Sequence, residues 1–227
     1  MANPNLLLVE GDEDFRVVPQ LVEANGHVWG ERPGPFLVDI KASDGIESLL
    51  AADEIGTRLK QSGLRRCGIM VDADSDPAGR WREVLARLPP MRVPMPEQPC
   101  EGGGFGETEL GVKVGIWLMP DNRGQGMLET FLQRLRRSEQ AELLTYAKEV
   151  CVAASDRGAP FKAVHIDKAA AHTLLAWQDP PGRQLHQAVM EYQLDPRGPG
   201  AAAFITWFRQ LYELTPPSTL GAAPSAA

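Results

Sequence analysis

The sequence has few cysteines, and their spacing excludes the usual cysteine-based structural sites. Only three occur among 227 residues, Cys67, Cys100 and Cys151, and no two of them form a CxxC pair. This pattern disfavours both a disulfide framework and a structural zinc site. We therefore expect a protein of a reducing compartment.

Long apolar runs and an excess of basic residues are also missing. No run approaches the ~20 apolar residues of a membrane span, and the start, MANPNLLLVEG, lacks the basic region of a secretory signal. We expect a cytoplasmic protein with no membrane partner. The 23 basic and 30 acidic residues give a formal charge of −7. That balance disfavours a purely electrostatic nucleic-acid binder, but it leaves room for a nucleic-acid enzyme with a local basic stripe.

Short apolar runs alternate with helical patterns in the first half of the chain. Buried strands are predicted at 5–9, 35–43, 67–74 and 113–120, and helices at 12–26, 45–63 (broken near Gly56), 77–88 and 126–137. A proline-rich loop or edge hairpin is expected at 89–111. The alternation predicts an α/β fold with a mainly parallel sheet flanked by helices.

The domain prediction follows from the change in composition along the chain. We expect an α/β core at 1–137, a helical C-terminal part packed on that core at 138–214, and a disordered tail at 215–227.

Acidic residues follow two of the predicted strands. Glu10 ends the first strand, and Asp72 and Asp74 end the third. The carboxyl ends of parallel strands meet at one edge of a sheet, so these side chains and Asp14 are expected together. Oxygen donors of this kind suit Mg²⁺ or Mn²⁺. The competing interpretation is helix capping. It explains Asp76, which precedes Pro77, but it explains Asp72 poorly because Asp72 still lies in the apolar run.

Three familiar acidic motifs fit incompletely. DADSDPAGRWRE has EF-hand-like spacing, but Pro77 stands where the turn glycine is required. DADS lacks the fourth residue of a haloacid-dehalogenase nucleophile motif. LLLVEGDEDF is similar to the start of a response-regulator receiver, but Gly11 replaces an acid there, and Asp53, at the distance of the acceptor, lies in a helical pattern.

A fourth pattern, VEG at 9–11 followed by DAD at 72–74, resembles the Toprim domain in order and context. LLLVEGDEDF, GIMVDADSDPAGRW, GIWLMPDNRGQGMLETFL and PFKAVHIDKAAAHTLLAWQDPPG resemble the DUF3226 family, over roughly residues 5–190. They are also similar to the nuclease domain of overcoming-lysogenization-defect (OLD) proteins.

The resemblance implies a two-metal nuclease site using Mg²⁺ or Mn²⁺. It places Glu10, Asp72, Asp74 and Lys168 in catalysis, and metal ligation at Glu10, Asp14, Asp72, Asp74 and Glu129, to which the alternating DADSD pattern adds Asp76. On residue type alone, Glu129 is equally well explained as an exposed helix residue, and Lys168 is better explained as part of an exposed helix start. His165 and His172 receive no role.

Arg80, Arg123 and Arg136 are candidates for phosphate contacts, although each is also typical of an exposed helix face. We therefore expect a metal-dependent nuclease acting on DNA or RNA, with a role in phage defence by family analogy. A partner ATPase is consistent with this, because the chain lacks GxxxxGK[ST]; a homodimer stays open. The alternatives are a non-catalytic receiver-like or Toprim-like metal- or nucleotide-binding module, and a small-molecule phosphatase or phosphotransferase.

Overall fold

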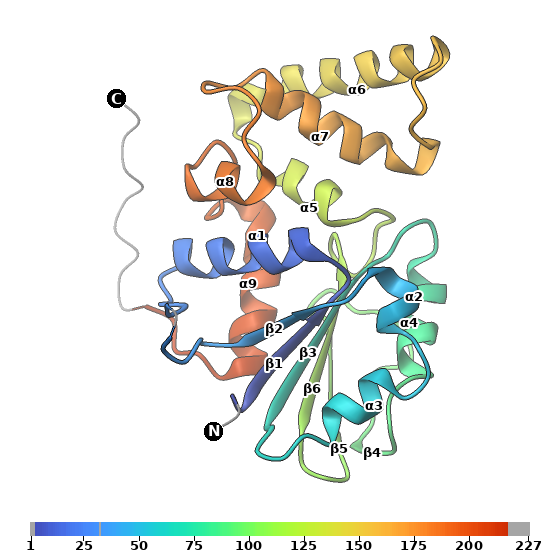
Figure 1. Cartoon of the computed structure of the whole chain (residues 1–227), viewed down its shortest axis with the longest axis vertical. Helices are drawn as coiled ribbons and strands as arrows, with labels where there is room; N and C mark the ends of the chain where they lie inside the picture. The colour runs from blue at the N-terminus through green and yellow to red at the C-terminus, as the bar shows by residue number, and fades with distance from the viewer. Residues whose placement is uncertain (1–2, 32, 218–227) are drawn as a thin grey trace.

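The computed structural model describes residues 3–31 and 33–217, and it is built on one six-stranded sheet. The strands are β1 (Asn5–Val9), β2 (Asp39–Ala42), β3 (Arg66–Asp72), β4 (Met91–Val93), β5 (Gly104–Thr108) and β6 (Lys113–Met119). Their order across the sheet is β2-β1-β3-β6-β5-β4 (Figure 1). The first four in this order are parallel to one another. β5 pairs antiparallel with β6, and β4 pairs antiparallel with β5. The predicted α/β fold with a mainly parallel sheet is confirmed.

Helices cover both faces of the sheet. They are α1 (Asp12–Ala24), α2 (Gly45–Leu49), α3 (Glu54–Leu59), α4 (Pro77–Leu85), α5 (Leu128–Arg134), α6 (Ala141–Asp156), α7 (Ile166–Ala176), α8 (Leu185–Met190) and α9 (Pro199–Tyr212). Short 3₁₀ turns, η1 (Ser138–Gln140) and η2 (Ala163–His165), precede α6 and α7. None of the helices in the described ranges has the length and apolar character needed to cross a membrane.

The strand residues alternate between two cores, as the pleat requires. Leu7 and Val9 belong to the core shared with α1 and α9, whereas Leu6 and Leu8 belong to the core shared with α2, α3 and α4. Because both faces are covered, β1 reads as a continuous apolar run rather than an alternating one. This explains why its strand could be predicted from NLLLV.

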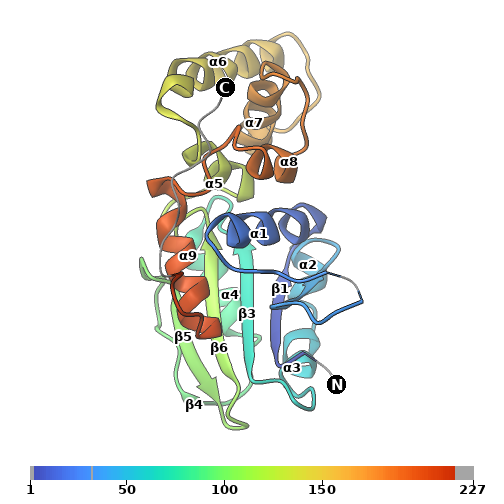
Figure 2. The same ribbon diagram turned by 90° about the vertical axis from the view of Figure 1, so that its left-hand side faces the viewer.

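Helix α9 lies directly on the sheet, although it is last in the chain (Figure 2). Gly68 of β3 and Gly115 of β6 are register partners, and a Cβ atom on either would meet the side chain of Leu211. The absent side chains therefore let α9 approach closely. The Tyr212 hydroxyl donates a hydrogen bond to the Leu6 carbonyl at 2.7 Å, which fixes the end of α9 against β1.

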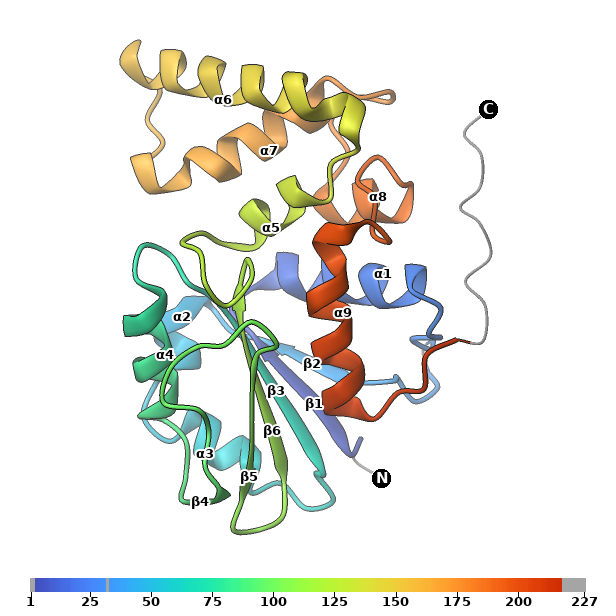
Figure 3. The ribbon, with the colours of Figure 1, turned by 180° about the vertical axis from the view of Figure 1, so that it is seen from behind.

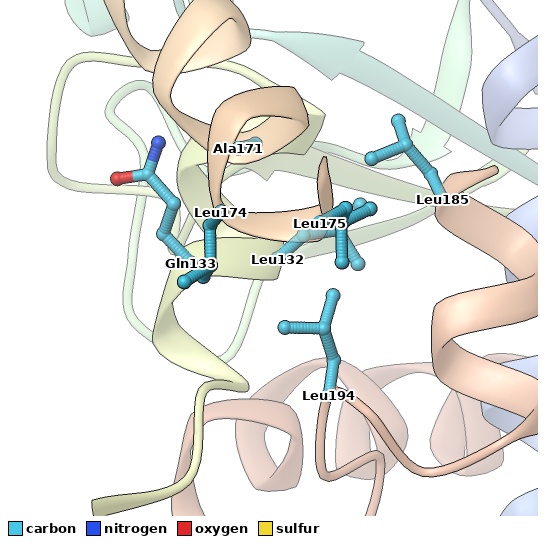
Figure 4. A pocket seen from close by; sticks show the side chains of 7 residues that line it. All are labelled: Leu132, Gln133, Ala171, Leu174, Leu175, Leu185 and Leu194. Atoms are coloured by element: carbon cyan, nitrogen blue, oxygen red, sulfur yellow. The ribbon is translucent and has the colours of Figure 1, made fainter. Parts of the chain in front are cut away.

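Helices α6 and α7 form a hairpin beyond the carboxyl edge of the sheet (Figures 1 and 3). Leucines of α5, α7, α8 and the following loop meet beneath it (Figure 4): Leu132, Leu174, Leu175, Leu185 and Leu194. They enclose a void of only about 10 Å³. That is room for about one water molecule, so this apolar contact attaches the hairpin to the core and is no ligand site.

Two details differ from the sequence-based expectation. The predicted helix over 45–63 is broken, but the break lies between Leu49 and Glu54 rather than at Gly56, which lies inside α3. Asp53 has a left-handed φ of 62° at this point. The strand predicted over 35–43 is shorter in the structure, where only Asp39–Ala42 form β2. Of the predicted tail, residues 218–227 lie outside the described residues.

Two glycine substitutions test the seating of α9. Gly68→Ala places a methyl group 2.6 Å from the Tyr212 hydroxyl and from Leu7, so we expect a loss of about 1–3 kcal/mol in the free energy of unfolding. Gly56→Ala is the matched control, since nothing lies within 4 Å of its Cβ position. It should raise helix stability by about 0.5–1 kcal/mol. Urea unfolding measures both; equal stability of the two variants would contradict the packing argument.

Candidate acidic site at the carboxyl edge of the sheet

The carboxyl ends of β1 and β3 lie side by side and bring Glu10 and Asp72 together. The Asp72 backbone N–H donates to Glu10 Oε1 at 2.7 Å. The Asp72 carboxylate Oδ1 in turn accepts from the backbone N–H of Leu128, at the start of α5, at 2.9 Å. The first and third strands thus deliver their acids to one place, as expected from the parallel arrangement.

Asp14 enters the same group from the first turn of α1. Its Oδ2 accepts from the Gly11 N–H at 3.1 Å, so it also helps to start the helix. The side chain is nevertheless buried, at 9% exposure, and the charges of Glu10 and Glu129 act on it. A residue that only caps a helix can make its hydrogen bond at the protein surface. Asp14 differs from such a residue because it is buried among other acids.

Glu129 and Lys168 complete the group from the helical part. Glu129, in the first turn of α5, is almost fully buried, and the Lys168 ammonium lies 2.9 Å from its Oε1. Burial opposes the charge of Lys168, but the hydrogen bond and charge of Glu129, together with Glu13 and Asp72, raise the pKa of Lys168. The amine therefore lies in the acidic site, 158 residues after Glu10 in the sequence.

Burial and mutual repulsion raise the pKa values of the acids. Burial is the largest cause at Glu10 and Asp14, and it raises the pKa of each to about 7. The pKa of Asp72 lies well above its ordinary value because of burial and the charges of Glu10, Asp14, Glu129 and Asp74. Since these groups interact, they titrate as a set rather than one by one.

Asp74 and Asp76 lie further out, in the loop before α4. Asp74 is exposed, has a left-handed φ of 50° and pairs with Arg80 at 2.7 Å. The Arg80 guanidinium also donates to the Asp72 carbonyl at 3.1 Å. Asp76 is the N-cap of α4 and accepts from the Gly79 N–H at 2.8 Å. The capping interpretation thus accounts for the contacts of Asp76, whereas Asp74 borders the buried acids.

The three arginines predicted to contact nucleic acid lie in different surroundings. Arg80 is mostly buried beside Asp74 and Glu83. Arg123 forms an exposed ion pair with Glu101. Arg136 lines a groove of about 320 Å³, together with Arg134 and Lys148. These contacts do not arrange the three into one basic stripe.

Asp167 is a residue of the site that sequence reasoning missed. Its carboxylate accepts from Thr130 Oγ1 at 2.7 Å and pairs with Lys148 at 2.9 Å, and its carbonyl accepts from Gln133 at 2.7 Å. Despite the opposing effect of burial, these donors lower its pKa. Asp167 thereby ties α7 to α5 directly beside Lys168. Its position before Lys168 in DKAAAH was the only signal for it in the sequence.

The donor atoms suit a hard divalent cation, but the side chains are not arranged around one. Glu10, Asp14, Asp72 and Glu129 offer only carboxylate oxygens, which Mg²⁺ and Mn²⁺ prefer. In residues 3–31 and 33–217, however, no three His, Cys, Asp or Glu side chains are placed to hold a metal ion. Glu10 and Asp72 each turn one oxygen to a backbone N–H instead. A cation would require these side chains to rotate.

The raised pKa values predict a pH dependence of stability without added metal. Glu10 and Asp14 bind protons more tightly in the folded than in the unfolded chain, so their contribution is complete below about pH 4 and is lost as the pH rises through about 7. We expect a loss of roughly 2–4 kcal/mol across this window. Thermal melts in EDTA test it. Glu10→Gln should flatten the decline, and Glu142→Gln, on the exposed side of α6, should not; a rise in stability from pH 5 to 8 would contradict the account.

Comparison with known proteins places the chain in a family. A family model described as "Protein of unknown function (DUF3226)" matches residues 4–213. No curated protein and no solved structure matches the chain. Because the family model spans nearly the whole sequence, the chain belongs to the DUF3226 family.

Proposed function

We propose that this protein is a divalent-metal-dependent nuclease with a Toprim-like core, which hydrolyses phosphodiester bonds of DNA or RNA. The observation that carries the proposal is the meeting of four buried or half-buried acids with one amine. Glu10 and Asp14 come from the junction of β1 and α1, Asp72 from β3 and Glu129 from α5, and Lys168 contacts Glu129. The order of VEG after β1 and DAD after β3, on adjacent strands, supports the Toprim-like assignment.

In this proposal the acids hold Mg²⁺ or Mn²⁺, and each residue has a distinct role. When bound, the cations supply Lewis-acid stabilisation of the charge on the attacking and leaving oxygens. Glu10 and Asp72 are the central ligands, with Asp14, Asp74 and Glu129 beside them. Arg80 orients the Asp74 carboxylate. We leave Asp76 out of the ligand set because its carboxylate caps α4.

Lys168 is proposed to stabilise negative charge on the scissile phosphate. A protonated amine has no lone pair for a metal, and the raised pKa of Lys168 keeps it protonated at neutral pH. The Lys168 side chain is about half exposed while that of Glu129 is buried, so the amine can face a bound phosphate and still neutralise Glu129. A fixed positive charge at this place would lower the energy of the transition state.

Family resemblance adds the biological setting to the proposal. A role in phage defence, beside a partner ATPase, follows from the likeness to OLD proteins and from the lack of a GxxxxGK[ST] loop.

A non-catalytic metal- or nucleotide-binding module is the second candidate. One observation favours its nucleotide-binding form: in the described ranges, no three His, Cys, Asp or Glu side chains are placed to hold a metal ion. The receiver-like form of this candidate has less support. Asp53 lies in the left-handed turn between α2 and α3, not at a strand end. In addition, β5 pairs antiparallel with both of its neighbours, β6 and β4, in a sheet that would be wholly parallel in a receiver.

The first test of the proposed function is the substitution of Asp72. Asn keeps the oxygen that accepts from Leu128 and removes one of the repelling charges, so Asp72→Asn should raise the melting temperature in EDTA at pH 8. It should also abolish the stabilisation by Mn²⁺ and any cleavage of plasmid, single-stranded DNA or RNA. Asp156→Asn, at the exposed end of α6, is the control and should behave as the wild type. Mn²⁺ stabilisation that persists in Asp72→Asn would refute the metal site.

A second test separates the amine from the ligands. Lys168→Met should lower the cleavage rate by ~10²–10³-fold, the scale for loss of one positioned transition-state donor. Because it leaves the buried Glu129 without its partner, it should also lower stability in EDTA, and Mn²⁺ should restore that stability. Lys162→Met, on the exposed segment before η2, is the control. Full activity in Lys168→Met would remove the lysine from the mechanism.

A further inference from the structure

A large cavity adjoins the acidic site and extends toward the helical hairpin. Its volume is about 690 Å³, within the usual range of ligand sites. Three segments form it: the loop between β3 and α4, the loop and first turn leading into α5, and η2 with the start of α7. Figures 1 and 3 both show the α6–α7 connection on the same side of the molecule as the β3–α4 loop. Asp74 lines the cavity and also borders the buried acids.

The walls of this cavity do not suit a phosphate group. Among the described residues, no lysine or arginine lines it, while Asp74, His165 and Asp167 do. The cations nearest to the two acids already pair with them, since Arg80 contacts Asp74 and Lys148 contacts Asp167. Met127, Val164 and Ile166 give it apolar surface from two separate segments. Such a site disfavours an anion and accommodates a neutral, partly apolar group that donates hydrogen bonds.

One acceptor in the cavity is oriented by the structure. Gln125 donates through Nε2 to the Ser75 carbonyl at 2.8 Å, which fixes its side-chain amide and leaves Oε1 as an acceptor. A nucleobase with an exocyclic amino group matches this chemistry, since carboxylate and amide oxygens are the natural acceptors for such a group. Its flat faces would lie against the apolar surface of Met127 and Val164.

We infer that this cavity binds the base of an unpaired nucleotide next to the scissile phosphate. The inference rests on the proposed nuclease function and adds the substrate class. A base within a duplex is stacked and paired, and extracting it costs a few kcal/mol. The cavity would therefore direct the enzyme to single-stranded nucleic acid, with a preference at this position for the bases that carry an exocyclic amino group (cytosine, adenine and guanine) over thymine or uracil.

Free nucleosides test the cavity without the metal or the reaction. Cytidine and adenosine carry the base but no phosphate, so they should bind in EDTA, whereas ribose should not; saturation-transfer NMR and calorimetry measure this. Val164 is 63% exposed, so Val164→Asp should fold normally. It should weaken nucleoside binding roughly tenfold, because it replaces apolar surface that lies against the flat face of the base with a hydrated charge. Val152→Asp, 51% exposed on α6 and outside the cavity, is the matched control. A second variant, Gln125→Ala, removes the oriented acceptor and should also weaken binding.

Oligonucleotide cleavage then separates this inference from the proposed function. With Mn²⁺, wild-type protein should cut a single strand faster than the same sequence in a duplex, and Val164→Asp should reduce that preference. Nucleoside binding without cleavage of any substrate would support the cavity and refute the nuclease. Cleavage without nucleoside binding, at equal rates on single and double strands, would refute the cavity and leave the nuclease intact. Equal nucleoside binding by Val164→Asp and Val152→Asp would also overturn the assignment.

Discussion

The burial of several carboxylates at one edge of the sheet is the constraint on which the rest of the structure depends. Each charge there is opposed by lost hydration and by its neighbours, so the pKa values of Glu10, Asp14 and Asp72 rise. Backbone N–H groups of Gly11, Asp72 and Leu128 offset part of this cost, and so does the ammonium of Lys168. A fold selected for stability alone would not gather these groups. Their convergence is therefore the strongest physical argument for a cation or a reaction at this edge.

The remainder of the architecture keeps these groups in register. Parallel pairing of β1 with β3 aligns the two strand ends. Helix α9 packs against both strands: Tyr212 donates a hydrogen bond to Leu6 of β1, and Leu211 lies over Gly68 of β3 and Gly115 of β6. On the other side, Asp167 joins α7 to α5 by hydrogen bonds from Thr130 and Gln133. Glu129 and Lys168 thus stand on helices that are fastened to each other next to the strand ends. Of the four acids and the amine, only Glu10 follows its strand; the other four groups lie on helices or strands, which hold side chains more rigidly than loops do.

Local patterns predicted the strand-borne part of the site, and tertiary contacts determined the rest. NLLLV and GIMVDAD are continuous apolar runs, so Glu10 and Asp72 could be placed at adjacent strand ends by the rule for parallel sheets. The capping role of Asp76 could also be anticipated from Pro77. No local signal pairs Lys168 with Glu129 or makes Asp167 a hub, because those contacts depend on how the α6–α7 hairpin packs on α5. The helix break was misplaced at Gly56 because a glycine inside a helix costs only about 1 kcal/mol, which α3 tolerates.

Charge is unevenly distributed around the acidic site, and under the proposed function this distribution would orient a nucleic-acid substrate. The net charge of −7 and the buried acids repel a polyanion unless cations intervene. Positive groups line one hollow, the groove of Arg134, Arg136 and Lys148. The larger cavity toward η2 carries acids and apolar surface but no lysine or arginine from the described ranges. Thr130 lines both hollows, so they meet beside Glu129. If a nucleic-acid single strand bound with its phosphates along the basic groove, the base next to the groove would enter the larger cavity, which suits a neutral group. Under the proposed function, the two hollows would separate a phosphate from its base. Only a single strand could be bound in this way, because the bases of a duplex are stacked and paired.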